Sequence, residues 1–222
     1  MGIHLFAFFR RTTLTYVEKT LEKDDVYTFS FEPNTPIRHI AGQHSLFVLT
    51  HPLNARPFSL ASSPDEAYVK VWTHIGSGSR YKKQLMKLVP GDTIQMFGPY
   101  LNFIPTADSL PIVMLAQGIG ITPFRSLLLW LAAHEPDRAT HLIHVESEPH
   151  TYRTETETAA TSARYVTNPE MFSQTLLEAA GQHPDGWFYI SGSPRFVRSI
   201  TEQLKKVGIS GKRIKKDGFL GY

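Results

Sequence analysis

The hydrophobic pattern of the chain changes once, near residues 101–110, and this change constrains the fold more than any other feature. Before it, short runs rich in Val, Thr, Phe and Tyr are separated by turn residues, which predicts β-strands. After it, continuous apolar runs alternate with stretches of helical period, which predicts β–α units and a parallel sheet. Because Pro105 interrupts the pattern, we expect two domains, residues 1–104 and residues 105–222.

The first part has the pattern of an antiparallel β-barrel, because several short strands follow one another with close turns. One helix, residues 80–89, is predicted among the strands, with Pro90 at its end. The predicted strands are residues 12–21, 26–32, 43–50, 56–62, 68–75 and 92–98.

The second part has the pattern of an α/β domain. Residues 112–116 are wholly apolar, as expected of a strand buried on both faces. Three helices are expected to open with a capping residue followed by proline, at Thr122, Asn168 and Ser193. Residues 148–162 are polar and show no clear helix. Further strands are predicted at residues 140–145, 164–167, 187–191 and 213–216, and helices at residues 169–180 and 194–207.

Composition excludes several classes of protein. With 222 residues, the chain suits one large domain or two small domains of roughly 100 residues each. It has no cysteine, so a disulfide scaffold, a thiolate zinc site and a cysteine-held iron–sulfur cluster are excluded. The apolar run at residues 5–9 is too short to span a bilayer, so we expect a cytoplasmic protein without a transmembrane segment.

The net charge is +3, and much of the excess lies late in the chain. A solvated basic face is the ordinary interpretation, and an acidic protein partner is the sharper one. Nucleic acid is not expected, because no nucleic-acid-binding motif accompanies the charge. The late cations are Lys205, Lys206, Lys212, Arg213, Lys215 and Lys216.

Residues 56–59, Arg-Pro-Phe-Ser, place a cation, a fixed backbone, an aromatic ring and a hydroxyl in succession. Arginine binds phosphate bidentately, phenylalanine stacks on flat rings, and a serine hydroxyl donates to a ring nitrogen. The run therefore suits a ligand that is anionic at one end and aromatic at the other. Taken alone, it is more typical of an edge strand with a surface arginine and a core phenylalanine.

Three strand-to-helix or loop-to-helix turns are candidate phosphate sites. Gly118 and Gly120 lie between a buried strand and an amphipathic helix, where backbone N–H groups favour anions. The third glycine of the dinucleotide fingerprint is missing, so a simple tight turn fits as well. Ser79 with Lys82, and the turn at Gly192, are similar candidates whose ordinary interpretations are a helix cap and a tight turn.

In their joint order these motifs resemble the ferredoxin–NADP(+) reductase-like family of FAD-dependent oxidoreductases along nearly the whole chain. Phe58 stands where that family usually has tyrosine, and Ser191 stands where many members have cysteine. The motifs that carry the resemblance are residues 42–43, 56–59, 79 with 82, 90–92, 98–99, 118–123, 192 with 194, and 219–222.

The resemblance implies a role for each matching residue. In the flavin domain, Arg56 holds a flavin phosphate, Pro57 directs its neighbours, Phe58 stacks on the isoalloxazine, Ser59 bonds near N5, and Ser79 with Lys82 takes the FAD pyrophosphate. In the nucleotide domain, Gly118, Gly120 and Thr122 take the pyrophosphate of NADP (or NAD), Gly192 leaves room for nicotinamide, and Ser191 lies near the hydride path. Tyr222 covers the second flavin face. Ser59, Ser191 and Tyr222 are the expected catalytic residues.

The implied function is hydride transfer from NAD(P)H to FAD and electron delivery to an acidic carrier such as ferredoxin or flavodoxin. A reductase that releases free reduced flavin and an electron-transfer subunit without its own turnover remain open, and a basic binding module is a weaker alternative.

Two features of the nucleotide domain bear on the dinucleotide and on metals. Glu146 and Glu148 would repel a 2′-phosphate, whereas Tyr152, Arg153 and Arg164 would bind it, and the balance slightly favours NADP(H). The histidines, His144 and His150 among them, are interpreted as structural or solvated, so no metal site is expected.

Overall fold

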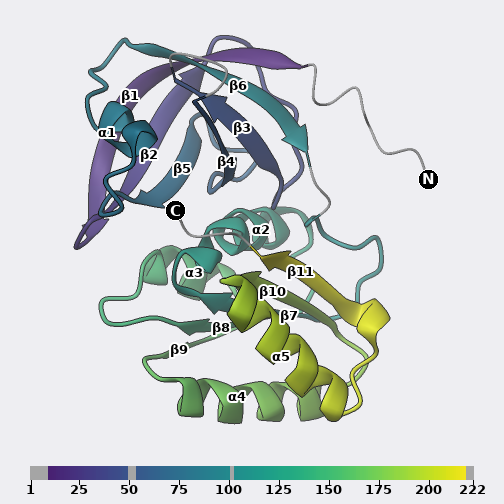
Figure 1. The fold of residues 1–222 in the computed structure, drawn as a ribbon. Helices are drawn as coiled ribbons and strands as arrows, with labels where there is room; N and C mark the ends of the chain where they lie inside the picture. The colour runs from purple at the N-terminus through teal and green to yellow at the C-terminus, as the bar shows by residue number, and fades with distance from the viewer. Residues whose placement is uncertain (1–9, 50–53, 101–102, 219–222) are drawn as a thin grey trace. The chain divides into compact units, whose positions relative to one another are not determined.

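A computed structural model describes residues 10–49, 54–100 and 103–218 of the protein (Figure 1). The contacts divide the chain into two compact units, one ending at Ile104 and the other beginning at Pro105. This division coincides with the change of hydrophobic pattern. The assignment of one unit to flavin and the other to nucleotide stays a prediction.

The first unit is a curled six-stranded antiparallel sheet in the order β4-β3-β6-β1-β2-β5. Its edges are β4 and β5, and the N–H of Ala61, two residues past the end of β4, donates to the carbonyl of Lys70 in β5 (2.8 Å). The predicted antiparallel sheet is confirmed. It is curled into a half-barrel, which is the coarser form of the barrel that the sequence predicted. The strands are β1 (Arg11–Lys23), β2 (Val26–Pro33), β3 (His44–Val48), β4 (Ala55–Ser59), β5 (Val69–His74) and β6 (Thr93–Tyr100).

Aromatic and aliphatic side chains from alternate strand positions fill this unit. Leu14, Phe29 and Phe31 are fully buried, as the period-two pattern of a half-buried strand requires. Helix α1 (Arg80–Leu85) adds Tyr81 and Leu85 to the same core. The helix is shorter than predicted, because hydrogen bonds of the i to i+3 kind replace the α-helical pattern after Leu85.

The second unit is a five-stranded parallel sheet in the order β11-β10-β7-β8-β9. Figure 1 shows α4 and α5 on one face of this sheet and α2 and α3 on the other. The strands are β7 (Ile112–Gln117), β8 (Thr140–Val145), β9 (Ser162–Val166), β10 (Trp187–Gly192) and β11 (Ile214–Gly218). The helices are α2 (Ile121–His134), α3 (Arg153–Ala159), α4 (Pro169–Gln182) and α5 (Pro194–Lys206), with the 3-10 turns η2 (Gly118–Gly120) and η3 (Gly211–Arg213).

Two expectations for this unit require correction. Helix α3 lies within the polar stretch for which no clear helix was predicted. Helix α2 begins at Ile121, so Thr122 lies inside its first turn and is not the cap that the sequence suggested. Asn168 and Ser193 are caps as predicted, since their side chains accept hydrogen bonds from the N–H groups of Met171 and Phe196.

Within the described residues, no helix is both long and apolar enough to cross a membrane.

Candidate functional site

The hairpin of β3 and β4 positions the Arg-Pro-Phe-Ser run at an edge of the first sheet. The register pairs His44 with Ser59 and Phe47 with Arg56. Proline at position 57 is compatible with this place, because an edge strand has N–H positions that need no ladder partner. Alternation along β4 then directs Phe58 to the opposite face from its neighbours.

Ser59 is hydrogen-bonded to a histidine that the sequence analysis did not single out. Its Oγ lies 2.9 Å from Nε2 of His44. His44 is buried, with 6% of its surface exposed, and Ser59 is half-buried. The pairing follows from the register of β3 and β4, which the sequence alone did not reveal.

Phe58 packs against the core of its unit rather than standing free of it. Its ring centroid lies 5.6 Å from that of Phe47 in an edge-to-face arrangement and 5.9 Å from that of Tyr81. The guanidinium of Arg56 lies 5.7 Å from the centroid of the Tyr81 ring. Burial raises the pKa of Tyr81, so its hydroxyl stays neutral at physiological pH. A cation and two aromatic rings therefore gather beside β4.

A second cation belongs to the same group. Lys82 lies in α1 and is 5% exposed. Its pKa is lowered first by burial, and the positive charge of Arg56 lowers it further, while Asp25 raises it. Ser79 caps the helix, because its Oγ accepts a hydrogen bond from the N–H of Lys82 (3.3 Å). A cation withdrawn from water in this way favours a bound anion.

In the second unit, η2 follows directly on β7. Gly118 has φ of +48°, a left-handed conformation that glycine adopts without strain. Its carbonyl oxygen lies 3.1 Å from Nε2 of His144 in the neighbouring strand β8. The loop that the sequence analysis proposed for phosphate is therefore anchored through its backbone by a buried histidine.

Gly120 permits η2 to approach the end of β10. A Cβ atom at this position would lie 2.2 Å from the carbonyl oxygen of Ser191 and 3.0 Å from the nitrogen of Gly192. The side chain of Gln117 joins the same two strand ends, since its Oε1 accepts a hydrogen bond from the Ser193 hydroxyl (2.7 Å). The two glycine turns predicted for the dinucleotide are thus brought together at the carboxyl edge of the sheet.

The polar side chains of these turns have partners within the protein. The Thr122 hydroxyl donates to the carbonyl of Ile119 (2.7 Å), and Thr122 is buried. Ser191 is fully buried, and its hydroxyl lies 3.4 Å from a carboxylate oxygen of Asp217. Roles for both residues stay predictions. Tyr222, the third expected catalytic residue, lies outside the described residues.

Both arginines that were weighed for the choice of NAD or NADP are ion-paired. Nη1 of Arg153 lies 3.7 Å from the Glu148 carboxylate, and the Arg153 guanidinium stacks 4.9 Å from the centroid of the Tyr165 ring. Arg164 pairs with Glu178 at 2.8 Å. A 2′-phosphate would therefore compete with carboxylates for either arginine.

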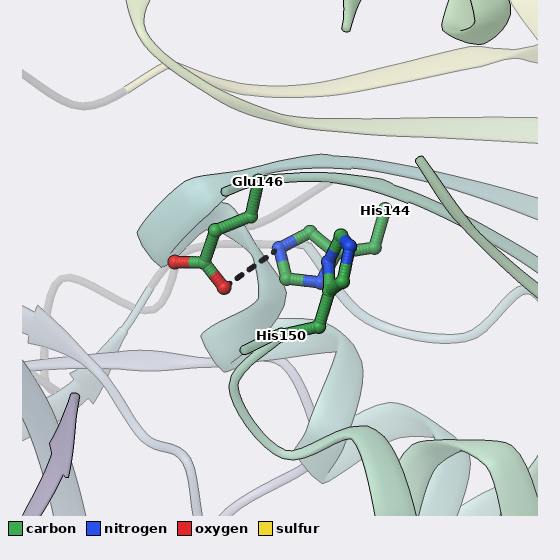
Figure 2. Close-up of side chains that lie close together, drawn as sticks. All are labelled: His144, Glu146 and His150. Carbon is green, nitrogen blue, oxygen red and sulfur yellow. Dashed lines mark ion pairs between the residues drawn. The ribbon is translucent and has the colours of Figure 1, made fainter. Parts of the chain in front are cut away.

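Glu146 belongs to a cluster that the sequence analysis missed. Figure 2 shows its carboxylate directed at the imidazole of His144, with the ring of His150 beside them. The Nε2 of His144 and Oε2 of Glu146 are 3.8 Å apart. The two histidine rings lie 5.1 Å apart between centroids. The sequence analysis treated His144 and His150 separately, as structural or solvated residues, and did not expect the loop that brings His150 back onto β8.

No family model matches the chain. It is 25% identical to the flavohemoprotein of Bacillus subtilis over 226 residues, which cover 89% of the chain and 56% of that protein. The chain thus spans little more than half the length of this curated relative.

Solved structures share the fold. The cytochrome P450 reductase GcoB of Amycolatopsis has a TM-score of 0.82 and 20% identity over 95% of this chain and 70% of that one. Ferredoxin–NADP+ reductase from Plasmodium falciparum has a TM-score of 0.78 and 16% identity over 99% of this chain and 100% of that one. These matches confirm the resemblance that the motifs indicated: the chain has the fold of the ferredoxin–NADP(+) reductase-like flavoproteins and is related in sequence to flavohemoproteins.

Proposed function

We propose that the protein is an NAD(P)H-dependent flavoprotein reductase that binds FAD with its first unit and the dinucleotide with its second. The observation that carries this proposal is the Arg56 guanidinium over the Tyr81 ring, with the Phe58 ring beside it and the buried cation Lys82 at the next position of α1. FAD joins a pyrophosphate to a flat aromatic ring, and this group of side chains offers charge for the first and ring surface for the second. The names of the relatives and of the structures with the same fold agree with this choice.

In the first unit, the side chains bind FAD and orient its ring. Arg56 and Lys82 hold the phosphates through charge-assisted hydrogen bonds. Phe58 presents a ring face to the flavin, while its contacts with Phe47 and Tyr81 fix its orientation. Ser59 hydrogen-bonds near flavin N5, and His44 fixes the direction of the Ser59 hydroxyl. FAD supplies the chemistry when it is bound, namely acceptance of a hydride and release of single electrons.

In the second unit, the turns at Gly118 and Gly192 bind NAD(P)H. The start of α2 and its preceding turn present backbone N–H groups to the pyrophosphate, as helix N-termini do in dinucleotide-binding folds. The closeness of Gly120 to Ser191 leaves the backbone of both turns at one edge of the sheet. Ser191 is proposed to lie near the hydride path, and its hydroxyl is directed to Asp217.

The dinucleotide is proposed to be NADP(H), with NAD(H) as the competitor, and the acceptor is proposed to be an acidic one-electron carrier of the ferredoxin or flavodoxin type. The visible spectrum of the purified protein tests flavin binding and the choice of dinucleotide, because bound flavin absorbs visible light and is bleached on reduction. NADPH and NADH are added separately under anaerobic conditions. Bleaching by NADPH at low concentration supports the proposal, and a colourless protein that takes up no FAD contradicts it.

Lys82→Ala and Lys83→Ala form a matched pair for the flavin site. Lys83 is the next residue along α1 and is exposed, whereas Lys82 is buried. Loss of one charge-assisted phosphate contact costs about 1.5–3 kcal/mol, so we expect FAD to bind about 10- to 150-fold more weakly to the Lys82 variant. FAD affinity is measured by fluorescence quenching. Equal FAD affinity in both variants would show that Lys82 does not contact the bound FAD.

A second candidate is an electron-transfer module without turnover of its own, since the sequence has no cysteine with which to bind an iron–sulfur cluster and would pass its electrons to redox centres held elsewhere. Reduction of bound flavin by NAD(P)H in the isolated protein argues against a module without turnover. A third candidate, a reductase that releases its flavin, is tested by gel filtration, since a retained yellow colour contradicts it.

A further inference from the structure

Two histidines and a glutamate converge at the carboxyl end of β8 (Figure 2). His144 lies in β8, Glu146 follows the strand directly, and His150 lies in the loop before α3. One possible ligand atom from each residue lies within 4.8 Å of the other two. We propose that this cluster binds one divalent transition-metal ion, with Zn²⁺ as the best-fitting ion.

The donor atoms have the chemistry of a zinc site. The Nε2 atom of His144 is 3.8 Å from Oε2 of Glu146. It also lies 3.1 Å from the carbonyl oxygen of Gly118, which only accepts hydrogen bonds, so zinc binding through this nitrogen displaces its proton and breaks that hydrogen bond. Two imidazoles with one carboxylate form a ligand set that Zn²⁺ accepts in protein sites, whereas Mg²⁺ and Ca²⁺ prefer oxygen ligands throughout. The mixed set therefore selects a transition metal over the hard cations.

Burial favours a cation in this place. The side chains of His144 and Glu146 are 0% and 9% exposed, and that of His150 is 0% exposed. A carboxylate withdrawn from water is costly unless positive charge or hydrogen bonds compensate for it. The N–H of Thr151 donates to Oε2 of Glu146 (2.9 Å), which fixes the direction of the carboxylate. A bound dication adds the compensating charge.

The surroundings hold the two rings in position. The ring of Tyr165 lies 5.3 Å from that of His150 and 6.3 Å from that of His144, between centroids. The Tyr165 hydroxyl is in turn 2.8 Å from Oγ1 of Thr156 in α3. Such outer contacts set the orientation of ligands and contribute to metal affinity.

Metal binding requires a small contraction of the cluster. Zinc bonds of about 2.0–2.1 Å in a tetrahedron place ligand atoms about 3.3 Å apart. The ligand atoms here must therefore approach one another by about 1.5 Å or less. Because His150 and Glu146 lie outside regular strand structure, rotation of their side chains and a shift of the loop achieve this while β8 stays in place. Glu148, whose Oε1 lies 3.5 Å from Nε2 of His150, or water completes the coordination.

Zinc binding to the full-length protein, freed of metal with a chelator, tests the proposal. Isothermal titration with ZnCl₂ alone is expected to give one site per chain, confirmed by elemental analysis after desalting. His150→Gln and Glu146→Gln are expected to weaken binding by at least about 100-fold, because loss of a ligand exceeds the loss of an outer contact. Zinc is also expected to raise the melting temperature of the wild type, since a ligand that binds the folded state stabilises it.

Two control variants separate this cluster from other histidines. His134→Gln removes an exposed histidine at the end of α2 and should bind zinc like the wild type. His141 and His183 form a stacked pair with ring centroids 4.1 Å apart, and this pair is the main competing zinc site. His183→Gln removes one member of the pair. Glu146→Gln keeps the size of the side chain, so it decides the matter if His150→Gln does not fold.

Three results would overturn the proposal. The first is no zinc uptake by the wild type up to 1 mM, far above the range expected of a protein zinc site. The second is wild-type affinity in the Glu146 and His150 variants. The third is loss of binding in the His183 variant alone, which places the ion at the other histidine pair.

Discussion

At the scale of single residues, Gly120 allows the turn η2 to lie directly against the backbone at the end of β10. A Cβ atom there would lie 2.2 Å from a backbone oxygen, so Gly120→Ala forces β10 and η2 apart. We expect a loss of about 1–3 kcal/mol in the free energy of unfolding, as in other overpacked sites. Gly181→Ala is the control, because nothing lies within 4 Å of a Cβ in that position of α4. It should be neutral or raise stability by up to about 1 kcal/mol. Urea unfolding measures both, and equal effects would contradict the close approach.

Lys82 gives a pH-dependent prediction at the same scale. Burial lowers its pKa, so the unfolded chain binds this proton more tightly than the folded chain. The contribution of Lys82 to stability is therefore unfavourable at neutral pH and improves as the pH rises toward 10.5, the ordinary value for lysine. Lys82→Met should reduce this rise in stability between pH 7 and 10, measured without FAD, whereas Lys83→Met should leave it unchanged. Parallel curves for the wild type and the Lys82 variant would contradict the shift.

At the scale of elements, α3 depends on a contact that links it to α2. Arg125 is 3% exposed in its side chain and donates two hydrogen bonds to Glu155, at 2.8 and 2.7 Å. Glu155→Ala leaves a buried guanidinium without that carboxylate, and we expect a cost of about 1–2 kcal/mol after allowance for the exposure of Glu155. Glu157→Ala removes an exposed partner of Arg153 and should cost less than about 0.5 kcal/mol. Chemical denaturation of both variants makes the comparison, and similar losses would show that the Arg125 contact contributes little.

The same helix shows why part of the fold was not predictable. The caps Asn168 and Ser193 act on residues three positions away, so a local reading of the sequence identified them. Helix α3 has the sequence Arg-Thr-Glu-Thr-Glu-Thr-Ala, which contains no apolar stripe, and its support comes from Arg125, 30 residues away in sequence from Glu155. The pairing of His44 with Ser59 was missed for a similar reason, since it depends on strand register.

At the scale of the whole molecule, composition and pattern predicted the two kinds of sheet but not the histidine cluster of Figure 2. The strands were predictable because each is a short apolar or alternating run that is bounded by turn residues in the sequence itself. The cluster was not, because His144 and Glu146 are brought to His150 by a loop of irregular structure. The sequence analysis interpreted the late cations as a solvated basic face, and this holds for some of them but not for all. Arg213 and Lys215 lie against the Trp187 ring, whereas Lys205, Lys206, Lys212 and Lys216 are exposed.

These four exposed lysines make a prediction about the proposed acidic carrier. Attraction between opposite charges speeds encounter at low ionic strength and is screened over about 10 Å at 0.1 M salt. The bimolecular rate of reduction of a plant-type ferredoxin or a flavodoxin, followed by stopped flow, should therefore fall about 10-fold or more between 0.02 and 0.5 M NaCl. The double variant Lys205→Glu and Lys206→Glu should lower the low-salt rate and flatten this dependence. The double variant Arg38→Glu and Lys87→Glu makes the same change in net charge at exposed positions of the first unit and should act less. Equal loss in both pairs would show that net charge alone steers the carrier, and a rate independent of salt would show that the late lysines do not steer it.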